Sequence, residues 1–179
     1  MINNGATVDN NGKIGKCYSF DGNDDFINLG NIGSYFDGSA FSICFWIYSL
    51  ENKTRAAVFS SYGLSSTSNF WGLELNSSNN NYCNNNLRFD WLGSDTYSPD
   101  DFVTYNAWTH ICVTYDGVNQ IKMYKNGALI QTSTRVLNAI PVGNTYYLGR
   151  DSRTGSTAFN GKLNDFRIYD HCLSPRECK

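Results

Sequence analysis

Short segments with strand-like patterns of apolar and polar side chains recur along almost the whole chain. Each is rich in β-branched and aromatic residues, and turn-forming residues bound nearly all of them. This combination is typical of β-strands. The segments cover residues 16–20, 24–30, 40–49, 56–63, 70–76, 86–93, 107–117, 120–134, 145–151 and 162–170.

The segment Phe41–Ser49 is bulky on both faces. Because successive side chains of a strand point to opposite sides, two sets of residues separate. We expect a central strand that is covered on both sides, and we expect Trp46 and Trp108 to lie in the core. The two sets are Phe41, Ile43, Phe45 and Ile47 on one face and Ser42, Cys44, Trp46 and Tyr48 on the other.

The connections between the segments are turns and not helices. Asn126–Gly127 stands between two strand-like runs and is a strong hairpin signal, because both residues tolerate positive φ. No amphipathic helix precedes Ser174. Ten to fourteen strands without helical crossovers predict an all-β, antiparallel β-sandwich of the jelly-roll kind, with at most a short C-terminal helical turn.

The C-terminal residues Ser174–Glu177 have the pattern of a helix start. Ser174 suits the N-cap, Pro175 the first helical position and Glu177 the capping-box position three residues on. A helix that begins so close to the last residue favours one domain over residues 1–179, excised from a longer chain. A short terminal turn is the alternative.

Charge and composition exclude several partners. The net charge is −2, the pI is about 5.6 and no basic run is present, so we expect no nucleic acid to bind. The longest apolar run, Ile43–Tyr48, is too short for membrane insertion. The first ten residues lack the features of a signal peptide. Six scattered cysteines predict reduced thiols, with Cys44 and Cys112 packed as small apolar residues, although Cys172 and Cys178 could pair.

Five segments occur in the order typical of laminin-G-like, concanavalin-A-like jelly rolls, and the chain resembles that family over nearly its whole length. The variant it resembles is found in bacterial surface proteins and in phage structural or tail proteins. Such sandwiches include lectins, glycosidase accessory modules, adhesion domains and structural modules, so the resemblance implies a fold more strongly than a function. The segments are Gly12–Gly30, Phe41–Ser49, Ala107–Gly117, Ile121–Gly127 and Phe159–Glu177.

The resemblance also implies a structural calcium ion near the junction of the first and last strands. Carried over to this chain, its ligands are Asp21, Asn23 or Asp25 together with Asp165. Calcium takes six to eight hard oxygen ligands, which Asp and Asn side chains supply. The alternative is a plain solvated turn at Asp21–Asp25.

Two other interpretations of the carboxylates fail. An EF-hand loop that starts at Asp21 would need glycine and glutamate where Phe26 and Ile32 stand. The Glu-x-Asp-x-x-Glu pattern of sandwich glycosidases is absent, since Glu51, Glu74 and Glu177 are widely separated. We therefore expect no catalytic residues, unless two carboxylates converge in space. His110 we expect to be a packed strand histidine.

Recognition is the function that remains. Sugars stack their apolar faces on aromatic rings and bond their hydroxyls to polar side chains. We expect a non-catalytic module that binds glycans or cell-surface polysaccharide at an extracellular, cell-surface or virion-surface location. The alternative is a structural or decorative domain that contacts other structural protein subunits in a virion or surface assembly. Candidate glycan-binding residues are Tyr62, Trp71, Trp91, Tyr97, Arg150, Asp151 and Arg153.

Overall fold

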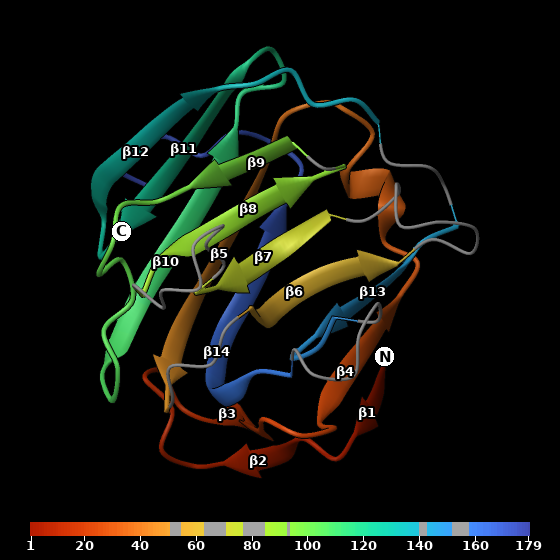
Figure 1. Ribbon diagram of the computed structural model, residues 1–179, viewed down its shortest axis with the longest axis vertical. Coiled ribbons are helices and arrows are strands. Elements are labelled where there is room, and N and C mark those ends of the chain that lie inside the picture. Colours follow the sequence, from red (N-terminus) through yellow and green to blue (C-terminus); the bar gives the residue numbers. More distant parts are fainter. Residues whose placement is uncertain (51–54, 63–70, 77–84, 93, 140–142, 152–157) are drawn as a thin grey trace.

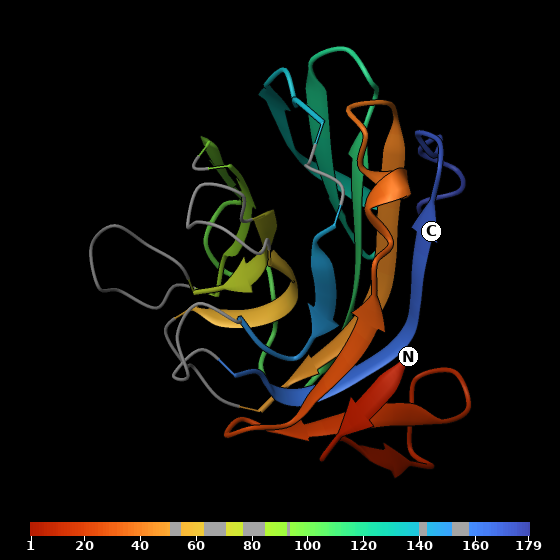
Figure 2. The same ribbon diagram turned by 90° about the vertical axis from the view of Figure 1, so that its right-hand side faces the viewer.

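The computed structural model describes all of the 179 residues except 51–54, 63–70, 77–84, 93, 140–142 and 152–157. Two seven-stranded antiparallel sheets face each other as a sandwich (Figures 1 and 2), which confirms the predicted fold class. In order across sheet A, the strands are β1 (Ile2–Asn4), β4 (Phe26–Gly30), β13 (Thr145–Leu148), β6 (Ala56–Tyr62), β7 (Trp71–Leu75), β8 (Leu87–Trp91) and β9 (Ser94–Tyr97).

Sheet B contains the long central strands. The described part of the chain holds no helix long and apolar enough to cross a bilayer, and its one helical element is the short 3-10 turn η1 (Gly33–Tyr35). In order across sheet B, the strands are β12 (Ala128–Thr134), β11 (Gln120–Lys125), β10 (Trp108–Tyr115), β5 (Phe41–Ser49), β14 (Asn160–Tyr169), β3 (Cys17–Asp21) and β2 (Thr7–Asp9).

Aromatic rings fill the space between the two sheets. The centroid of the Phe36 ring lies 4.4 Å from that of Trp71 and 5.4 Å from that of Tyr146. Phe41 stacks on Trp91 with centroids 5.6 Å apart. All five side chains are buried. Offset and edge-on pairs of this kind add to the stabilisation that burial alone supplies.

The alternation along β5 correctly predicts which side chains enter the core. Phe41, Ile43, Phe45 and Ile47 are fully buried between the sheets. The prediction that the opposite face is also covered is wrong for the C-terminal half of the strand, where Trp46 is only partly buried. On this side Lys13 reaches over the Trp46 ring, and the C-terminal residues cover the other end of the strand.

Two predicted turns form as expected. Asn126 and Gly127 connect β11 to β12 with φ values of +49° and +81°, the pair of positive values that a tight hairpin requires. At the C-terminus, the Ser174 Oγ and N–H both donate to Glu177 Oε2, at 2.7 and 2.8 Å. These capping-box contacts close a turn on the outer side of sheet B, near the label C in Figure 2.

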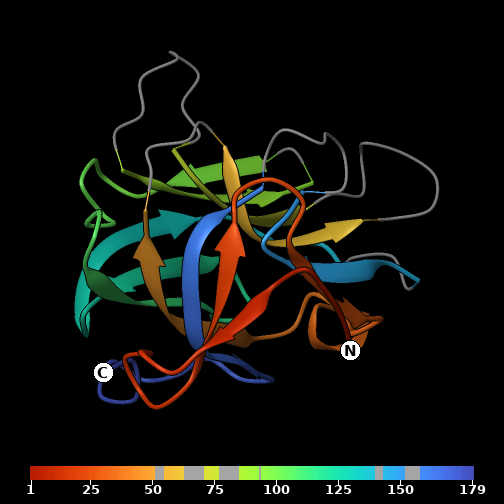
Figure 3. The ribbon, with the colours of Figure 1, turned by 90° about the horizontal axis from the view of Figure 1, so that it is seen from below.

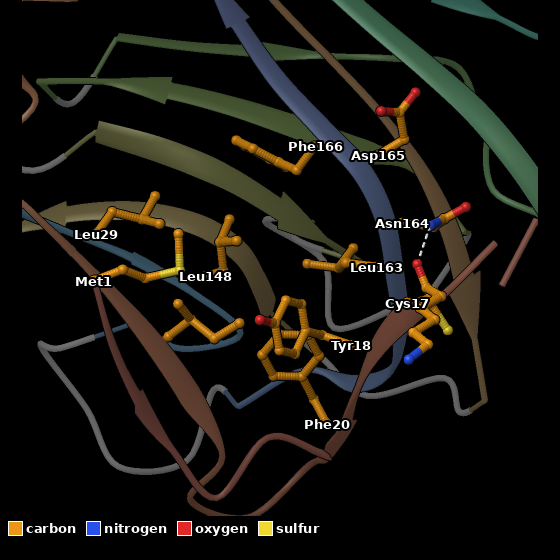
Figure 4. Close-up of a pocket in the computed structure, with 12 residues that line it drawn as sticks. Met1, Cys17, Tyr18, Phe20, Leu29, Leu148, Leu163, Asn164, Asp165 and Phe166 are labelled. Carbon is orange, nitrogen blue, oxygen red and sulfur yellow. Dashed lines mark hydrogen bonds between the residues drawn. The ribbon is translucent and has the colours of Figure 1, made fainter. Parts of the chain in front are cut away.

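A β-bulge interrupts β14, which lies between β5 and β3 (Figure 3). The register with β5 shifts between Asn164 and Arg167, and Asp165 has a φ of +52°. Figure 4 shows the result: Phe166 points inward, and Asp165 points away on the other side of the strand. The bulge therefore places Asp165 on the outer surface of sheet B.

Candidate functional site

Three aspartates come together at the turn between β3 and β4. Ligand oxygens of Asp21, Asp24 and Asp25 all lie within 4.8 Å of one another. The N–H of Asn23 donates to Asp21 Oδ1 at 2.8 Å, and the N–H of Asp21 donates to Asp25 Oδ2 at 2.9 Å. These bonds make a compact acidic loop in which oxygen atoms face one another.

The electrostatics of this loop suit a hard cation. Burial raises the pKa of Asp25 above its ordinary value, and the carboxylates of Asp21 and Asp24 raise it further, against the bond from Asp21 N–H. Among the residues that the structure describes, no lysine or arginine forms an ion pair with these three side chains. A divalent cation would relieve both the crowding of like charges and the burial of Asp25.

Asp165 does not join this acidic loop. In the pairing of β14 with β3, Asn160 lies opposite Asp21, and Asp165 follows five residues later. That offset is roughly 15 Å along a strand. Asp165 instead accepts a bond from Arg167 Nε at 2.8 Å. The structure thus brings together Asp21 and Asp25 of the predicted ligands and adds Asp24, while Asn23 bonds to Asp21.

Trp71 and Trp91 need a correction as candidate sugar platforms. Both lie in the core between the sheets, with exposed fractions of 0% and 2%. Trp91 Nε1 donates to the carbonyl oxygen of Asn138 at 3.0 Å, so its polar edge is also occupied. Neither ring has a face that a sugar could cover.

The other predicted glycan contacts are not gathered at one place. Tyr97, on β9, donates its hydroxyl to Asp95 Oδ2 at 3.1 Å. Arg150 lies just after β13, and its guanidinium carbon is 4.4 Å from the centroid of the Phe26 ring. Three strands, β6 to β8, separate these two positions.

The structure describes the side chain of only one of the three remaining predicted contacts. Asp151 is buried. Tyr62 belongs to β6, where its backbone pairs with Thr145, and Arg153 lies outside the described residues.

An ion network occupies the outer side of β7, β8 and β9. Arg88 lies 2.6 Å from Glu74, 3.0 Å from Asp90 and 2.9 Å from Asp95. Burial by itself lowers the pKa of Arg88, but the surrounding carboxylates outweigh it and the pKa stands above its ordinary value. Three carboxylates therefore do converge in space, and a guanidinium binds all three.

Four aromatic side chains form a second surface on the outer side of sheet B. Trp108 of β10 lies opposite Tyr48 of β5, with ring centroids 5.5 Å apart, and His110 lies opposite Trp46 at 5.1 Å. All four are partly exposed. They form a continuous aromatic ladder along two neighbouring strands.

A shallow groove of about 540 Å³ follows this ladder, and we call it the aromatic groove. Lys13 Nζ lies 4.9 Å from the ring centroid of Trp46. A second pocket of about 250 Å³ adjoins the groove and includes Asp165 and Arg167 in its wall. The aromatic groove is lined by Lys13, Trp46, Trp108, His110, Asn126 and Lys179.

His110 brings polar atoms to the groove. Its backbone N–H donates to Asn126 Oδ1 at 2.8 Å, and its ring Nδ1 is buried without a hydrogen-bond partner in the described structure. Burial lowers the pKa of His110 below the ordinary 6.5, Asp165 opposes that shift and Arg167 adds to it. At neutral pH the imidazole is therefore uncharged, and a proton sits on one of its two nitrogens.

A third hollow lies between the sheets near the N-terminus and differs in character (Figure 4). It measures about 220 Å³, and its wall consists mainly of apolar side chains such as Met1, Phe20, Leu148 and Phe166. Asn164, at its margin, donates through Nδ2 to the carbonyl oxygen of Lys16 at 2.7 Å. It is a gap between the sheets whose wall is mostly apolar, with polar side chains such as Lys16, Asn164 and Asp165 in the minority.

Comparison with known proteins assigns the family. Residues 21–179 match the family model described as the concanavalin A-like lectin/glucanases superfamily. The chain belongs to this superfamily. The match covers the acidic loop and nearly all residues of the aromatic groove, while Lys13 precedes it.

Relatives within this superfamily are distant in sequence. Pentraxin-related protein PTX3 of Mus musculus is 24% identical over 153 residues, which are 78% of this chain and 38% of that protein. The chain thus spans well under half the length of this curated relative.

Two solved structures share the fold. Domain 4 of AbnA, an extracellular GH43 arabinanase of Geobacillus stearothermophilus in complex with arabinotriose, has a TM-score of 0.71 and 19% identity, covering 98% of this chain and 80% of that one. A putative carbohydrate binding protein of Bacteroides ovatus has a TM-score of 0.71 and 17% identity, covering 90% and 45%.

The aromatic groove contains two residues, Trp46 and Trp108, that the sequence pattern predicts in the core. Bulky residues on both faces of Phe41–Ser49 predict a covered position for Trp46, and the core-like segment around Trp108 predicts the same, but both rings are partly exposed. The alternation did separate Trp46 from the core-facing set. His110, two residues from Trp108, is the one polar neighbour that the sequence places on the same face, whereas Lys13 and Asn126 join these residues only in the folded structure.

Proposed function

We propose that this domain binds carbohydrate without modifying it, and that the aromatic groove of sheet B is the binding surface. The observation that carries the proposal is the pair of partly exposed indoles, Trp46 and Trp108, on neighbouring strands. Indole faces attract the polarised C–H groups of a pyranose or furanose ring. Large aromatic rings left in contact with water on a rigid sheet are otherwise costly.

The polar groups around these rings complete a sugar-binding chemistry. His110 offers its Nε2 to a ligand, because Nδ1 is buried. The bond from His110 N–H to Asn126 Oδ1 orients the Asn126 amide, and the Nδ2 group of that amide can donate to a ligand. Lys13 adds a cation beside Trp46. Apolar faces together with a few fixed polar groups are what a ligand site requires.

The comparisons support the same substrate class. The AbnA domain is in complex with arabinotriose, and the Bacteroides ovatus protein is described as carbohydrate-binding. The proposed setting is extracellular, on a bacterial cell or a virion, where the domain would hold its parent protein to glycans or to cell-surface polysaccharide. The AbnA arabinanase is itself described as extracellular.

The absence of catalysis is part of the proposal. A glycosidase needs two carboxyl groups that face a sugar, one as acid and one as base or nucleophile. The carboxylates that converge on sheet A are Glu74, Asp90 and Asp95, and each one binds Arg88. Glu74 and Asp90 are also buried, at 0% and 2% exposure, and present no oxygen to a ligand in solution.

Calcium has a structural role in this proposal. Asp21, Asp24 and Asp25 would hold the ion, and it would fix the turn that joins β3 of sheet B to β4 of sheet A. Tying the two sheets at one end stabilises the sandwich without placing the metal in the aromatic groove.

A glycan array tests the proposal, run once with calcium and once with EDTA. We expect selective binding to at least one glycan class in both arms. Trp108→Ala should weaken the affinity for the best glycan by about tenfold or more, because a stacked ring contributes on the order of 1.4 kcal/mol.

Tyr35→Ala is the matched control, since Tyr35 is also an exposed ring but does not line the groove. It should leave the affinity unchanged. If Tyr35→Ala and Trp108→Ala weaken binding equally, or if no glycan binds to the folded domain, the proposal is wrong.

A protein-contact role is the second candidate, and one observation favours it. Edge strand β12 is exposed along its length, with Leu129 at 51% and Ile130 at 42%. An uncovered edge strand with apolar side chains can pair with another subunit. Light scattering across a concentration series checks this alternative: association that Leu129→Lys abolishes would support it, and a monomer at all concentrations would count against it.

A further inference from the structure

Three buried cysteines from distant parts of the chain meet on the outer side of sheet B, beside the aromatic groove. Cys44 of β5 lies directly opposite Cys112 of β10, and Cys178 comes from the C-terminal turn. Tyr124 and Leu173 pack around them in the same small cluster. None of the three forms a disulfide, and each is less than 10% exposed.

Two sulfur atoms of this cluster are in direct contact. Cys112 Sγ and Cys178 Sγ lie 3.2 Å apart, and 66 residues separate them along the chain. Both thiols have raised pKa values, Cys112 through its contact with Cys44 and its burial, and Cys178 through burial. In the closed structure both are therefore protonated, and they pack as apolar groups.

Few bonds hold the C-terminal turn against sheet B. The Ser42 hydroxyl donates to the carbonyl oxygen of His171 at 2.8 Å and accepts from the N–H of Leu173 at 2.9 Å. The other bonds of the turn are internal, from Glu177 and Cys178 N–H to the Ser174 carbonyl. A segment tied by one side chain opens more readily than the sheet beneath it, and opening exposes Cys178.

We propose that Cys112 and Cys178 form a disulfide that fastens the C-terminal turn to β10 when the domain meets a small-molecule disulfide. In this exchange the thiolate of Cys178 attacks oxidised glutathione, forming a mixed disulfide and releasing one glutathione. The thiolate of Cys112 then displaces the second glutathione. Two protein thiols are oxidised to one disulfide, and one oxidised glutathione is reduced to two thiols.

Geometry favours this pair over Cys44 with Cys112. The backbones of Cys44 and Cys112 are both held in an eight-residue ladder between β5 and β10, which limits how far either can adjust to the distance and dihedral of a disulfide. Cys178 stands on a turn that can adjust. The bond would also fix one wall of the ligand-binding surface, because Glu177 lines the pocket beside the aromatic groove and Lys179 lines both.

Disulfide mapping tests the proposal without any glycan. The domain is equilibrated with oxidised glutathione, the free thiols are blocked, and non-reduced peptides are identified by mass spectrometry. We expect the peptide that joins Cys112 to Cys178 as the main cross-link. We also expect the melting temperature to fall by roughly 5–15 °C on reduction, since the bond closes a long loop.

Two variants test whether the cross-link depends on Cys178. Cys178→Ser should remove both the cross-link and the effect of reduction on melting, and it alters only the terminal turn. Cys17→Ser is the matched control, because Cys17 is equally buried but lies on β3 outside the cluster, and it should keep both. A main cross-link between Cys44 and Cys112, any other partner for Cys178, or no cross-link in the folded wild-type domain would overturn the proposal.

Discussion

The outer faces of the two sheets are built from the same alternating strands, yet they differ in what they offer to solvent. On sheet A, Glu74, Arg88 and Asp90 point outward and are largely buried, and their charges are satisfied by one another. On sheet B, Trp46 and Trp108 point outward and remain partly exposed. On sheet A the polar groups are paired with one another, whereas on sheet B the aromatic rings remain accessible to a ligand.

This difference shows that residue type alone does not mark a binding surface. Arginine and aspartate are the residues most often expected to bond sugar hydroxyls, but here they form an internal network. Indoles are the residues most often expected in a core, but two of the four tryptophans are accessible at the surface. A binding surface requires that its groups be both exposed and not already paired.

The largest expected effect comes from breaking the network on sheet A. Arg88→Met should lower the free energy of unfolding by about 3–5 kcal/mol, because Glu74 and Asp90 would stay buried and lose the cation that lies nearest to them, although Arg55 remains 3.5 Å from Glu74. Urea denaturation of the purified variant measures this.

Arg167→Met is the matched control on sheet B. Its ion pair with Asp165 is 57% exposed on the arginine side, so the loss should be about 0–1 kcal/mol. Equal losses for the two variants would mean that the two faces do not differ as described.

Calcium removal should have the next largest effect. At a calcium concentration a hundred times the dissociation constant, the ion adds about 2.7 kcal/mol of stability. EDTA should therefore lower the melting temperature by roughly 5–10 °C, as measured by differential scanning fluorimetry.

Two carboxylate variants locate the ion. Asp24→Asn should abolish the EDTA effect, because Asp24 belongs to the acidic loop. Asp165→Asn should preserve it, because Asp165 is bonded to Arg167. If Asp165→Asn abolished the EDTA effect and Asp24→Asn preserved it, Asp165 would be a calcium ligand and the assignment of the ion to the acidic loop would be wrong.

Loss of an exposed indole should cost less stability than either change. Trp108→Ala removes an edge-on contact with Tyr48, which is worth about 1 kcal/mol. Trp71→Ala, at 0% exposure, should cost about 3–5 kcal/mol. Thermal unfolding of both variants compares them, and a cost for Trp108→Ala as large as that of Trp71→Ala would show that Trp108 is part of the core.

The smallest expected effect is on pH dependence. Because the pKa of His110 is lower in the folded state than its ordinary 6.5, the unfolded chain binds the proton more tightly. The contribution of His110 to stability is complete above pH 7, begins to fall near the ordinary pKa of 6.5 and is lost as the pH drops through the lower pKa of the folded state. His110→Gln should flatten this part of the stability curve between pH 7 and pH 5, and a variant with the same slope as the wild type would contradict the shift.

Local patterns predicted the parts of the fold that depend on neighbouring residues. The inward set of β5, the Asn126–Gly127 hairpin and the Ser174–Glu177 capping contacts all form as expected. Each follows from the pleat of a strand, from backbone conformations that few residues adopt, or from bonds within one turn. The sandwich itself follows from the number of such strands and the lack of helices between them.

The site depended on contacts between segments that are far apart in the chain. Alternation assigns Trp46 and Phe45 to opposite faces, but it does not say which face another sheet covers. Only the strand order of sheet B and the position of the C-terminal turn left Trp46 exposed and covered Cys44. The same holds for Trp71 and Trp91, which are candidate sugar contacts by sequence and lie against Phe36 and Phe41 in the structure.

The amino-acid sequence by itself thus determined the strands, their turns, the all-β class and the acidic loop, because these arise from residues within a few positions of one another. The tertiary structure alone decided that a bulge moves Asp165 away from Asp21, that Arg88 binds three carboxylates and that Cys112 meets Cys178. The burial of a side chain and the partners of its polar atoms depend on which distant segment packs against it, and local alternation does not specify that segment.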